Sequence, residues 1–595
     1  MRRASMNTLV GLLLTGVLLA GLFWLIGRAS PSAERADLRL IENVSIGTLD
    51  PAAISQLQDI RVAIQVFEGL TAFNPQGGEP RAGCATDWTV DDTRTNWEFH
   101  IRPDARWSNG DPVTAGDFLF AWRRAIEPGT AKDYAFFFEL VAGVKEYVQW
   151  RHAEIARISA LRPDAQLAAR DAHLAESDRR FADTVAMTAD GPHTLRIRLT
   201  RPVAYWLDLL STPVFMPLHE STVRPFRMPD DAGHIFYDPR WLRPGVTVFN
   251  GPYVLSDWRF KRSLTLRANP MHPDHAALRV RSVEILDVTD SNTAWLMYDD
   301  GRVDLLPSVK AVYTPELVER SDSPYSNALN HNSGGRDDIH AIGAFGTYFY
   351  NLNCQPRLPG GKSNPLANPA LRRAIAMAVD SNALCRGVLR QNEVPADTLI
   401  PPGTIDGYPR IQGLPFDPLR AKAELASAGY RSPTDVPEIV ISYNHEANHG
   451  IIAQTVESML KKNLGIRVRT EGKESQTFSA AKQDHDFQIA RASWYGDYGD
   501  PTTFLDVFTT GNGNNDSGYR DPNYDGLLAL AEKADAAPSR LRLLSKAEKR
   551  LMQETLPLLP LYHDVNVYAF RPSQVRGIVL NPRLLIHYRD LEVRR

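Results

Sequence analysis

Segments with the pattern of a β-strand alternate with segments that have the pattern of an amphipathic helix along almost the whole chain. In one such pair, Trp97, Phe99 and Ile101 alternate with polar residues, which is typical of a half-buried strand, and a helix capped by residues 114–117 follows. Further strands are expected at residues 38–49, 193–199 and 438–444, and helices at 61–70 and 418–430. This order predicts an α/β fold.

The size and charge of the chain exclude some functions. With 595 residues, of which 43% are hydrophobic, it is long enough for roughly three to four domain-sized units. Its formal net charge is -3, and the body of the chain contains no run of Lys or Arg that could follow a phosphate backbone. Nucleic acid is therefore not expected as a partner.

The N-terminus has the pattern of an export signal. Arg2 and Arg3 precede an apolar run from Leu9 to Ile26, and a polar stretch follows. The run is longer than a usual signal-peptide core and close to a membrane span, so residues 1–36 are either a removed signal or a retained inner-membrane anchor. In both cases the chain from about residue 37 onward is expected outside the inner membrane.

Three cysteines are few for an exported protein of this length. A disulfide between Cys354 and Cys385 and a set of free buried cysteines are both compatible with the sequence, and Cys84 is left over in either case. The fold is not expected to depend on disulfides.

Residues 486–505 hold the most informative polar side chain. Asp497 lies among Trp494, Tyr495 and Tyr498, where a carboxylate loses hydration unless a cation or several donors meet it. The ammonium group of a bound ligand is one such cation. The ordinary alternative is that Asp497 caps a turn or pairs with a nearby Arg.

Several separated blocks resemble one family. Residues 86–124 contain the order W-T-V-x-x-D, W-x-F-x-I-R and W-S-N-G-D-P-V-T-A-x-D-F, which is similar to the signature of the extracytoplasmic solute-binding proteins of peptide ABC importers. Further blocks that match are FNGPYVLSDW (249–258), AWLMYDDGRVDLL (294–306), TYFYNLN (347–353), NPALRRAIAMAVD (368–380), PLRAKAELASAGY (418–430) and LPLLPLYH (556–563). The resemblance covers nearly everything beyond residue 37.

The resemblance implies a type II periplasmic-binding-protein fold with two lobes, a hinge and an extra subdomain. Lobe I is expected to comprise residues 37–75, 200–340 and 562–595, the extra subdomain residues 76–199, and lobe II residues 341–561. Residues 144–186 form a helical insertion, expected to be a solvated helical pair, with a docking surface as the alternative.

The function implied by the resemblance is capture of oligopeptides in the cleft between the lobes and their delivery to an ABC permease in the inner membrane. We expect a periplasmic monomer that is not an enzyme, with no catalytic residue, no cofactor and no metal site. A specialised ligand on the same fold (a murein peptide, a dipeptide, haem or a metal chelate) is the alternative.

Members of the family bond a peptide backbone as an added strand and meet its ends with charges. By this resemblance Asp497, in the block that includes Trp494, receives the α-ammonium of the ligand. Ser493 and Tyr495 match positions that pair with the ligand backbone on one side. Residues from Ser55 to Leu57 match the strand on the other side, and Tyr134 matches a tyrosine near the ligand.

The other end of the ligand is assigned in the same way. Arg491 and His449 match positions that receive the C-terminal carboxylate for one peptide length, and Lys482 matches a basic position used for a longer peptide. Ser475 stands where some members have a pocket-lining Trp, so that pocket is expected to be wider or more polar. Gly346 and Tyr495 replace a cysteine pair of some members, and we expect the Tyr495 ring to point toward the ligand backbone.

A competing hypothesis comes from a different class of protein. His445, Glu446, Ala447, Asn448 and His449 form an H-E-x-x-H pattern, which on a helix places two imidazoles and a glutamate base beside a zinc ion. This would indicate a zinc peptidase. However, the preceding residues 438–444 read as a strand, so the pattern falls in a loop between a strand and a helix.

Overall fold

The computed structural model describes residues 35–309, 336–390, 393–445, 448–534 and 536–595. The apolar run from Leu9 to Ile26 lies outside these ranges, so the export prediction is not tested by the structure. Within the ranges, no helix combines the length and the apolar character needed to cross a membrane.

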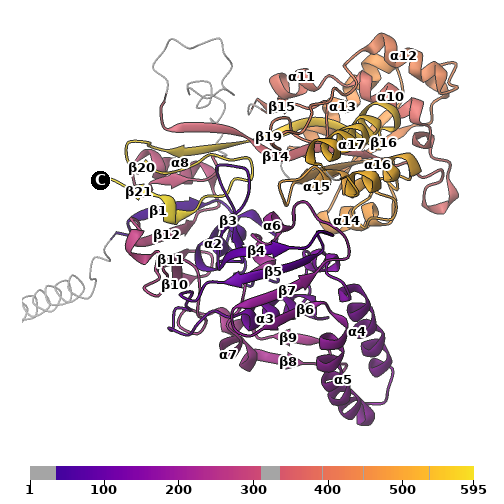
Figure 1. Ribbon diagram of the computed structural model, residues 1–595. Helices are drawn as coiled ribbons and strands as arrows, with labels where there is room; N and C mark the ends of the chain where they lie inside the picture. Colours follow the sequence, from indigo (N-terminus) through magenta and orange to yellow (C-terminus); the bar gives the residue numbers. More distant parts are fainter. Residues whose placement is uncertain (1–34, 310–335, 391–392, 446–447, 535) are drawn as a thin grey trace, which may run out of the picture. The chain divides into compact units, whose positions relative to one another are not determined.

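The largest element of the fold is a mixed sheet of eleven strands, with helices packed against it (Figure 1). Its strand order is β10-β11-β12-β1-β13-β19-β14-β18-β16-β17, and β15 pairs with β19 beside this path. The strands are β1 (Leu38–Glu42), β10 (Tyr253–Arg259), β11 (Ser263–Ala268), β12 (Ser282–Asp287), β13 (Leu305–Leu306), β14 (Ile339–Leu352), β15 (Val394–Pro395), β16 (Ile439–Asn444), β17 (Val468–Lys473), β18 (Ile489–Tyr495) and β19 (Leu558–Phe570). The α/β prediction is confirmed.

The first strand and helix differ from their predicted bounds. Strand β1 ends at Glu42 rather than near residue 49, and helix α2 spans Leu57–Val66 rather than 61–70. Between them Asp50 accepts the backbone N–H of Ala52 at 3.1 Å, which makes a turn at Pro51. Ile46 and Leu49 of this loop are buried without being part of a strand, which is why the sequence pattern alone overextended β1.

Several of the helices begin at a side-chain cap, for example α8 (Ser291–Asp299) at Asp290 and α16 (Pro522–Glu532) at Asp521. The helices are α2, α3 (Ala115–Ile126), α4 (Val144–Ser159), α5 (Pro163–Thr184), α6 (Trp206–Leu209), α7 (Glu220–Val223), α8, α10 (Pro369–Ala378), α11 (Ser381–Leu384), α12 (Pro418–Ser427), α13 (His449–Leu464), α14 (Ser475–Gln483), α15 (Thr502–Leu505), α16 and α17 (Ala537–Lys549). In α3, Thr114 and Asp117 form a reciprocal capping box, as the sequence predicted for residues 114–117.

Smaller sheets complete the fold. Four antiparallel strands form one of them in the order β4-β5-β7-β6, and the other pairs are β2-β3, β8-β9 and β20-β21. These strands are β2 (Thr71–Ala72), β3 (Arg81–Ala82), β4 (Ala85–Val90), β5 (Asn96–Ile101), β6 (Met187–Asp190), β7 (Thr194–Arg198), β8 (Arg227–Pro229), β9 (Ile235–Tyr237), β20 (Val575–Arg576) and β21 (Glu592–Val593).

Residues 144–186, predicted to be a helical insertion, form a pair of helices, α4 and α5. Arg151 of α4 is completely buried and forms an ion pair of 2.6 Å with Glu127, which also accepts the hydroxyl of Tyr147 at 2.7 Å. A buried guanidinium needs such a partner, so this contact fixes α4 against the end of α3.

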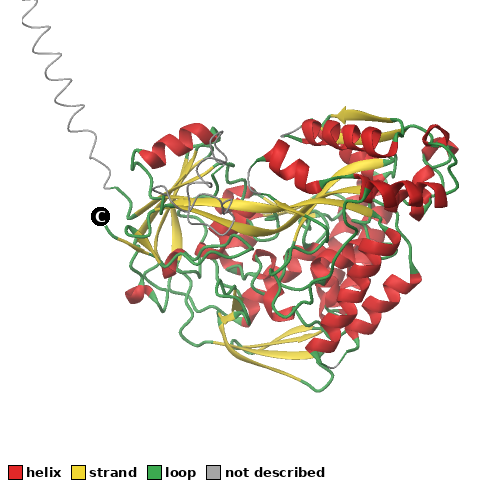
Figure 2. Ribbon diagram, turned by 90° about the horizontal axis from the view of Figure 1, so that it is seen from above, coloured by secondary structure: helices red, strands yellow, loops and turns green. Residues whose placement is uncertain are grey.

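Two long strands link separate hydrophobic cores. Strands β14 and β19 run antiparallel side by side (Figure 2). Near Ile339 they pack with α8, whereas from Tyr348 onward they pack with α10 and α13. Their pairing is interrupted between Gly343 and Thr347, where the register shifts. Such a bulge bends a strand pair locally.

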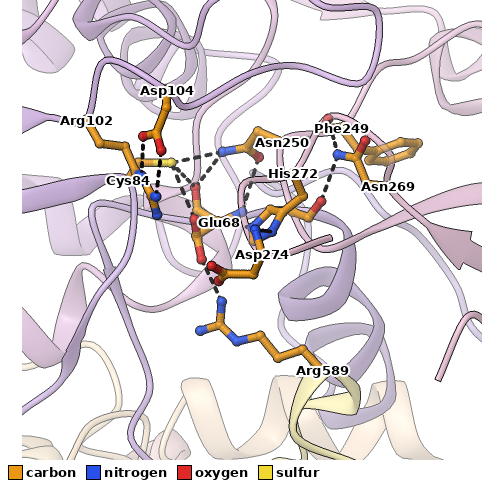
Figure 3. Close-up of polar contacts among 11 residues, drawn as sticks. Glu68, Cys84, Arg102, Asp104, Phe249, Asn250, Asn269, His272, Asp274 and Arg589 are labelled. Atoms are coloured by element: carbon orange, nitrogen blue, oxygen red, sulfur yellow. Dashed lines mark hydrogen bonds and ion pairs between the residues drawn. The ribbon is translucent and has the colours of Figure 1, made fainter. Parts of the chain in front are cut away.

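A buried polar cluster joins α2 to the C-terminal segment (Figure 3). Glu68 forms an ion pair of 2.8 Å with Arg589 and approaches His272 at 3.7 Å, and Asn250 donates to its backbone carbonyl at 2.8 Å. Burial raises the pKa of Glu68, but the nearby His272 and the charge of Arg589 outweigh this effect and lower it to about 2. The carboxylate is therefore ionised in the core.

All three cysteines are free, so the alternative with a disulfide between Cys354 and Cys385 is wrong. Cys84 is buried beside Glu68, and its thiol lies 3.3 Å from the amide nitrogen of Asn250. Burial and the carboxylate of Glu68 raise the pKa of this thiol well above its usual range. Cys84 is therefore a protonated core residue, not a nucleophile.

We predict that Arg589→Met lowers the free energy of unfolding by about 3 to 5 kcal/mol, because it leaves the buried carboxylate of Glu68 without a counter-charge. Urea denaturation at pH 7 measures this change. Arg594→Met is the matched control, since its ion pair with Glu592 is solvent-exposed and should change stability by less than about 0.5 kcal/mol. Equal effects of the two variants would contradict the assignment.

Candidate functional site

The turn after β18 is held rigidly by its own polar groups. The indole N–H of Trp494 donates to the carbonyl of Thr503 at 2.6 Å, and the backbone N–H of Asp497 donates to the hydroxyl of Thr503 at 2.9 Å. Trp494 therefore supports the turn from the face that packs with α15 and α16, rather than from the face of Ser493. The indole N–H of Trp494 is used in this internal hydrogen bond rather than in the predicted contact with a ligand.

The two acids of this turn have different partners. Asp500 forms a two-pronged ion pair with Arg540, at 2.5 and 2.9 Å, so the ordinary interpretation as a paired turn residue applies to it. Asp497 accepts the hydroxyl of Tyr134 at 2.8 Å, and none of the described residues forms an ion pair with its carboxylate. The sequence prediction placed Asp497 and Tyr134 in one site, and the structure brings them into direct contact.

The carboxylate of Asp497 is one of several buried acids in the protein whose pKa is raised, together with Asp506 and Glu548. Burial raises its pKa from the ordinary value to about 6, although the hydrogen bond from Tyr134 and the charge of Arg583 act in the opposite direction. The side chain is only partly exposed. A cationic group that arrived here would restore the interaction that the carboxylate lost when it left water.

Main-chain contacts fix the other side of the turn. The guanidinium of Arg583 donates to the carbonyl of Asp497 at 3.0 Å and to both carboxylate oxygens of Asp208, at 2.7 and 2.9 Å. Asp208 in turn accepts the backbone N–H of Gly499 at 2.7 Å. Sequence reasoning missed both residues, because no local pattern marks a pair separated by 375 positions.

Strand β18 has an open edge beside this turn. On one side it pairs with β14 along its full length, from Ile489 to Tyr495. On the other side it pairs with β16 only at Ile489 and Ala490, and no other described strand covers residues 491–495. Unpaired backbone groups of this kind are a template for an added strand.

The register shows which residues face the open edge. The backbone N–H of Gly496 donates to Phe345 at 2.8 Å, on the side of β14. Because the direction of backbone groups alternates along a strand, the N–H and C=O groups of Arg491, Ser493 and Tyr495 point to the opposite side. Ser493 and Tyr495 are the residues predicted to pair with a ligand backbone.

The Tyr495 ring does not point toward the open edge as expected. Tyr495 pairs directly with Gly346 of β14, and a Cβ atom added to Gly346 would meet the Tyr495 ring at 2.7 Å. The ring thus lies over the neighbouring strand, in a space that is open because Gly346 has no side chain. The two residues that replace a cysteine pair are therefore in contact.

The predicted carboxylate-binding residues are also brought together. The Tyr348 hydroxyl shares a hydrogen bond of 3.1 Å with His449, and its ring lies 5.1 Å below the guanidinium carbon of Arg491. The buried Nε atom of Arg491 has no hydrogen-bond partner among the described residues. Since buried donors are normally paired, this atom is suited to receive a carboxylate oxygen. Tyr348 was not singled out from the sequence.

Three other predicted residues are not joined to this group. The ammonium of Lys482 forms an ion pair with Asp516 at 2.8 Å, so a ligand carboxylate would have to compete with that aspartate. Ser55 lies in the loop before α2 and Leu57 is the first residue of that helix. In the described part of the chain, neither of them forms a hydrogen bond with β18.

The zinc-peptidase hypothesis is not supported by the local geometry. His445 follows β16, whereas His449 is the first residue of α13, so the two imidazoles do not share a helical face as the motif requires. Glu446 and Ala447 lie outside the described residues, and the remaining described residues contain no cluster of three or more metal-ligating side chains. As the sequence indicated, the pattern belongs to a strand-to-helix connection.

Comparisons with known proteins identify a family for this chain. Residues 79–516 match the model of the bacterial extracellular solute-binding proteins, family 5 (middle part). The chain is 29% identical over 553 residues to the periplasmic murein peptide-binding protein MppA of Escherichia coli, which covers 92% of this chain and 91% of that protein. It is 29% identical over 535 residues to the dipeptide-binding protein DppE of Bacillus subtilis, covering 89% and 86%.

Solved structures show the same architecture. Haemophilus influenzae OppA in complex with the peptide RPPGFSPFR has a TM-score of 0.69 and 26% identity, covering 94% of this chain and 99% of that one. The murein tripeptide-binding protein MppA of Escherichia coli has a TM-score of 0.71 and 27% identity, covering 94% and 99%. The fold class expected from the sequence, a type II periplasmic-binding fold, is therefore confirmed.

We predict that Asp497→Asn stabilises the ligand-free protein by about 1 to 3 kcal/mol at pH 7.5. The folded-state pKa lies above the unfolded one, so ionisation of Asp497 costs stability as the pH rises from about 4 to 6, and Asn avoids that cost. The gain should be complete above pH 6 and vanish below about pH 4. Urea denaturation at pH 7.5 and pH 4 measures it.

Asp500→Asn is the matched control three residues away. It removes the partner of Arg540 and should lower stability at pH 7.5. A loss of stability in Asp497→Asn as well would mean that the Asp497 carboxylate has a stabilising partner in the free protein.

Proposed function

Because the chain belongs to the bacterial extracellular solute-binding proteins of family 5, we propose that it is the substrate-binding component of an ABC transporter. It captures oligopeptides outside the inner membrane and delivers them to a membrane permease. The single observation that carries the proposal is the carboxylate of Asp497, which has no ion-pair partner among the described residues and stands at the end of an open strand edge. That combination suits an ammonium group followed by a peptide backbone.

Recognition of the backbone is the first part of the mechanism. An extended peptide beside β18 would pair with the outward N–H and C=O groups of Ser493 and Tyr495, and its α-ammonium would reach Asp497. Pairing through main-chain groups does not depend on the side chains of the ligand. The site would therefore require a peptide with a free N-terminus but tolerate many sequences.

The electrostatic part of the mechanism fixes the direction of the peptide. An ammonium group at Asp497 would meet a carboxylate that burial has already deprived of water, and Tyr134 would continue to donate to it. At the other end, Arg491 and His449 are suited to a C-terminal carboxylate, and both contact Tyr348. Binding of this kind needs no catalytic residue, cofactor or metal ion.

Closure around the ligand follows from the proposed division into lobes. We assign residues 37–75, 200–340 and 562–595 to lobe I, and residues 341–561 to lobe II, with residues 76–199 as the extra subdomain. The register shift between Gly343 and Thr347, where β14 and β19 pass from one hydrophobic core to the next, supports a hinge there. The protein would act as a periplasmic monomer without a nucleic-acid partner.

A murein peptide is the second candidate ligand. The relative MppA binds murein peptides according to its name, and it matches this chain over 91% of its own length. The pair formed by Gly346 and Tyr495 beside the ligand edge also differs from the cysteine pair found in some peptide binders. Both candidates carry the same requirement for an ammonium group at Asp497.

The decisive test of the proposed function is calorimetric titration with tri- and tetrapeptides. We predict that the protein binds peptides with a free N-terminus and that Asp497→Asn weakens them about tenfold to a hundredfold, because one charge-assisted contact is lost. N-acetylated peptides, which lack the ammonium, should bind weakly to both proteins. A similar loss for both kinds of peptide would contradict the role of Asp497.

The pH dependence of the same titration gives a second criterion. Protonation of Asp497 removes the charge that attracts the ammonium, so affinity should fall as the pH drops below about 6, by up to tenfold per pH unit. Asp497→Asn should remove this dependence.

The proposed binding of the ligand's C-terminal carboxylate leads to a prediction about peptide length. Amidation of the C-terminus should weaken binding at the one length whose carboxylate reaches Arg491 and His449, and should have little effect at other lengths. Calorimetry with paired acid and amide peptides of two to five residues measures this. Arg491→Gln should abolish the difference at that length, and equal affinities of acid and amide at every length would remove the assignment.

A further inference from the structure

An ion pair lies directly behind the Asp497 carboxylate. Arg583 holds both oxygens of Asp208, at 2.7 and 2.9 Å, while its other terminal nitrogen donates to the carbonyl of Asp497 at 3.0 Å. The two charged side chains are only 13% and 19% exposed. Because the guanidinium is planar and engaged on two sides, its orientation is fixed.

Both partners come from parts of the chain remote from the turn. Asp208 lies in α6, and Arg583 lies in the segment that follows β20, with its guanidinium carbon 4.7 Å from the centre of the Phe73 ring. Asp208 also accepts the backbone N–H of Gly499 at 2.7 Å. The pair therefore binds the turn at two main-chain points, one at Asp497 and one two residues later.

A stacked aromatic pair reinforces the same junction. The rings of Tyr205 and Tyr498 are nearly parallel, with centres 4.0 Å apart, and Tyr205 precedes α6 directly. Phe137 meets Tyr498 edge-on at 6.1 Å, three residues after Tyr134. The turn is thus held from α6 and from the Tyr134 segment, and its main chain has little freedom to move away from Arg583.

We propose that Arg583, oriented by Asp208, is a positioning residue for the ammonium-binding carboxylate of Asp497. It fixes the main chain from which that carboxylate projects and places a compensating positive charge behind it. The inference rests on the proposed function, because it concerns how the site recognises the ligand's ammonium. Arg583 itself does not contact the ligand.

The charges around Asp497 agree with this role. The titratable and charged groups that act on Asp497 or on its immediate partners are Tyr134, Asp133, Arg583 and Asp208. Burial raises the pKa of Asp497, whereas the hydrogen bond of Tyr134 and the charge of Arg583 lower it. Among the described residues, Arg583 is the cation whose charge lowers the pKa of Asp497, and its own partner is Asp208.

The principal test is Arg583→Gln, examined by calorimetric titration of the full chain with one free-amine tripeptide and its N-acetylated form. At pH 7.5 the free-amine peptide should bind about tenfold more weakly, and the acetylated peptide should change by less than about twofold. The pH below which affinity falls should rise by about one unit from its wild-type value, because the carboxylate loses the field of Arg583.

The second variant is Asp208→Asn, for which the pH profile should shift in the opposite direction. It should also weaken the free-amine peptide at pH 7.5, since Arg583 loses its orienting partner. The pH below which affinity falls should move down instead of up, because a negative charge is removed while Arg583 stays. Opposite pH shifts in the two variants cannot arise from a general loss of structure.

Two further variants complete the design. Arg594→Gln removes an exposed ion pair with Glu592 and should change neither affinity nor pH profile. In an Asp497→Asn background, Arg583→Gln should cause almost no additional loss for the free-amine peptide, because both act through the same carboxylate. An additive loss would overturn the proposal.

The outcomes separate this inference from the proposed function. If the wild-type protein binds no peptide, or binds free and acetylated peptides equally, the proposed function itself fails. If the wild type prefers the free amine but Arg583→Gln weakens both peptides equally with an unchanged pH profile, Arg583 is only structural. If Arg583→Gln does not fold, the downward pH shift in Asp208→Asn decides the question.

Discussion

The site depends on one carboxylate that the fold buries without a direct ion-pair partner among the described residues. Asp497 keeps a single side-chain hydrogen bond, from Tyr134, and its pKa rises to about 6 because burial dominates. Its neighbour Asp500 shows the usual arrangement, with a guanidinium on both oxygens. This contrast between two acids within four residues is the basis for the role proposed for Asp497.

The surrounding elements hold the turn that carries Asp497 in place. Thr503 fixes the turn from within, Arg583 and Asp208 fix it from remote segments, and the aromatic stack of Tyr205 on Tyr498 closes the junction. A rigid frame of this kind lowers the entropy that binding would otherwise lose. It also explains why a stability cost at Asp497 is tolerated, because sites for ligands often trade stability for recognition.

The sequence predicted the α/β class, because strand and helix periodicities alternate and are local properties. It also predicted that Asp497 would meet Tyr134, but only through the resemblance to a family, since the two residues are 363 positions apart. It could not predict Arg583 with Asp208, nor the pairing of Lys482 with Asp516, because such contacts depend on how distant segments meet. The direction of the Tyr495 ring was missed because it depends on the pairing with Gly346 across the sheet.

The short open edge of β18 affects the tendency of the protein to aggregate as well as its binding of a ligand. Unpaired strand edges invite association with other copies of a chain, and long ones lead to aggregation. Here the edge is confined to residues 491–495, between the pairing with β16 and the turn at Gly496. Only three of these residues present their backbone outward, which is too few to hold an extended foreign sheet. For the same reason, only a short part of any peptide can form backbone hydrogen bonds with β18. The rest of a longer peptide must be held by looser contacts.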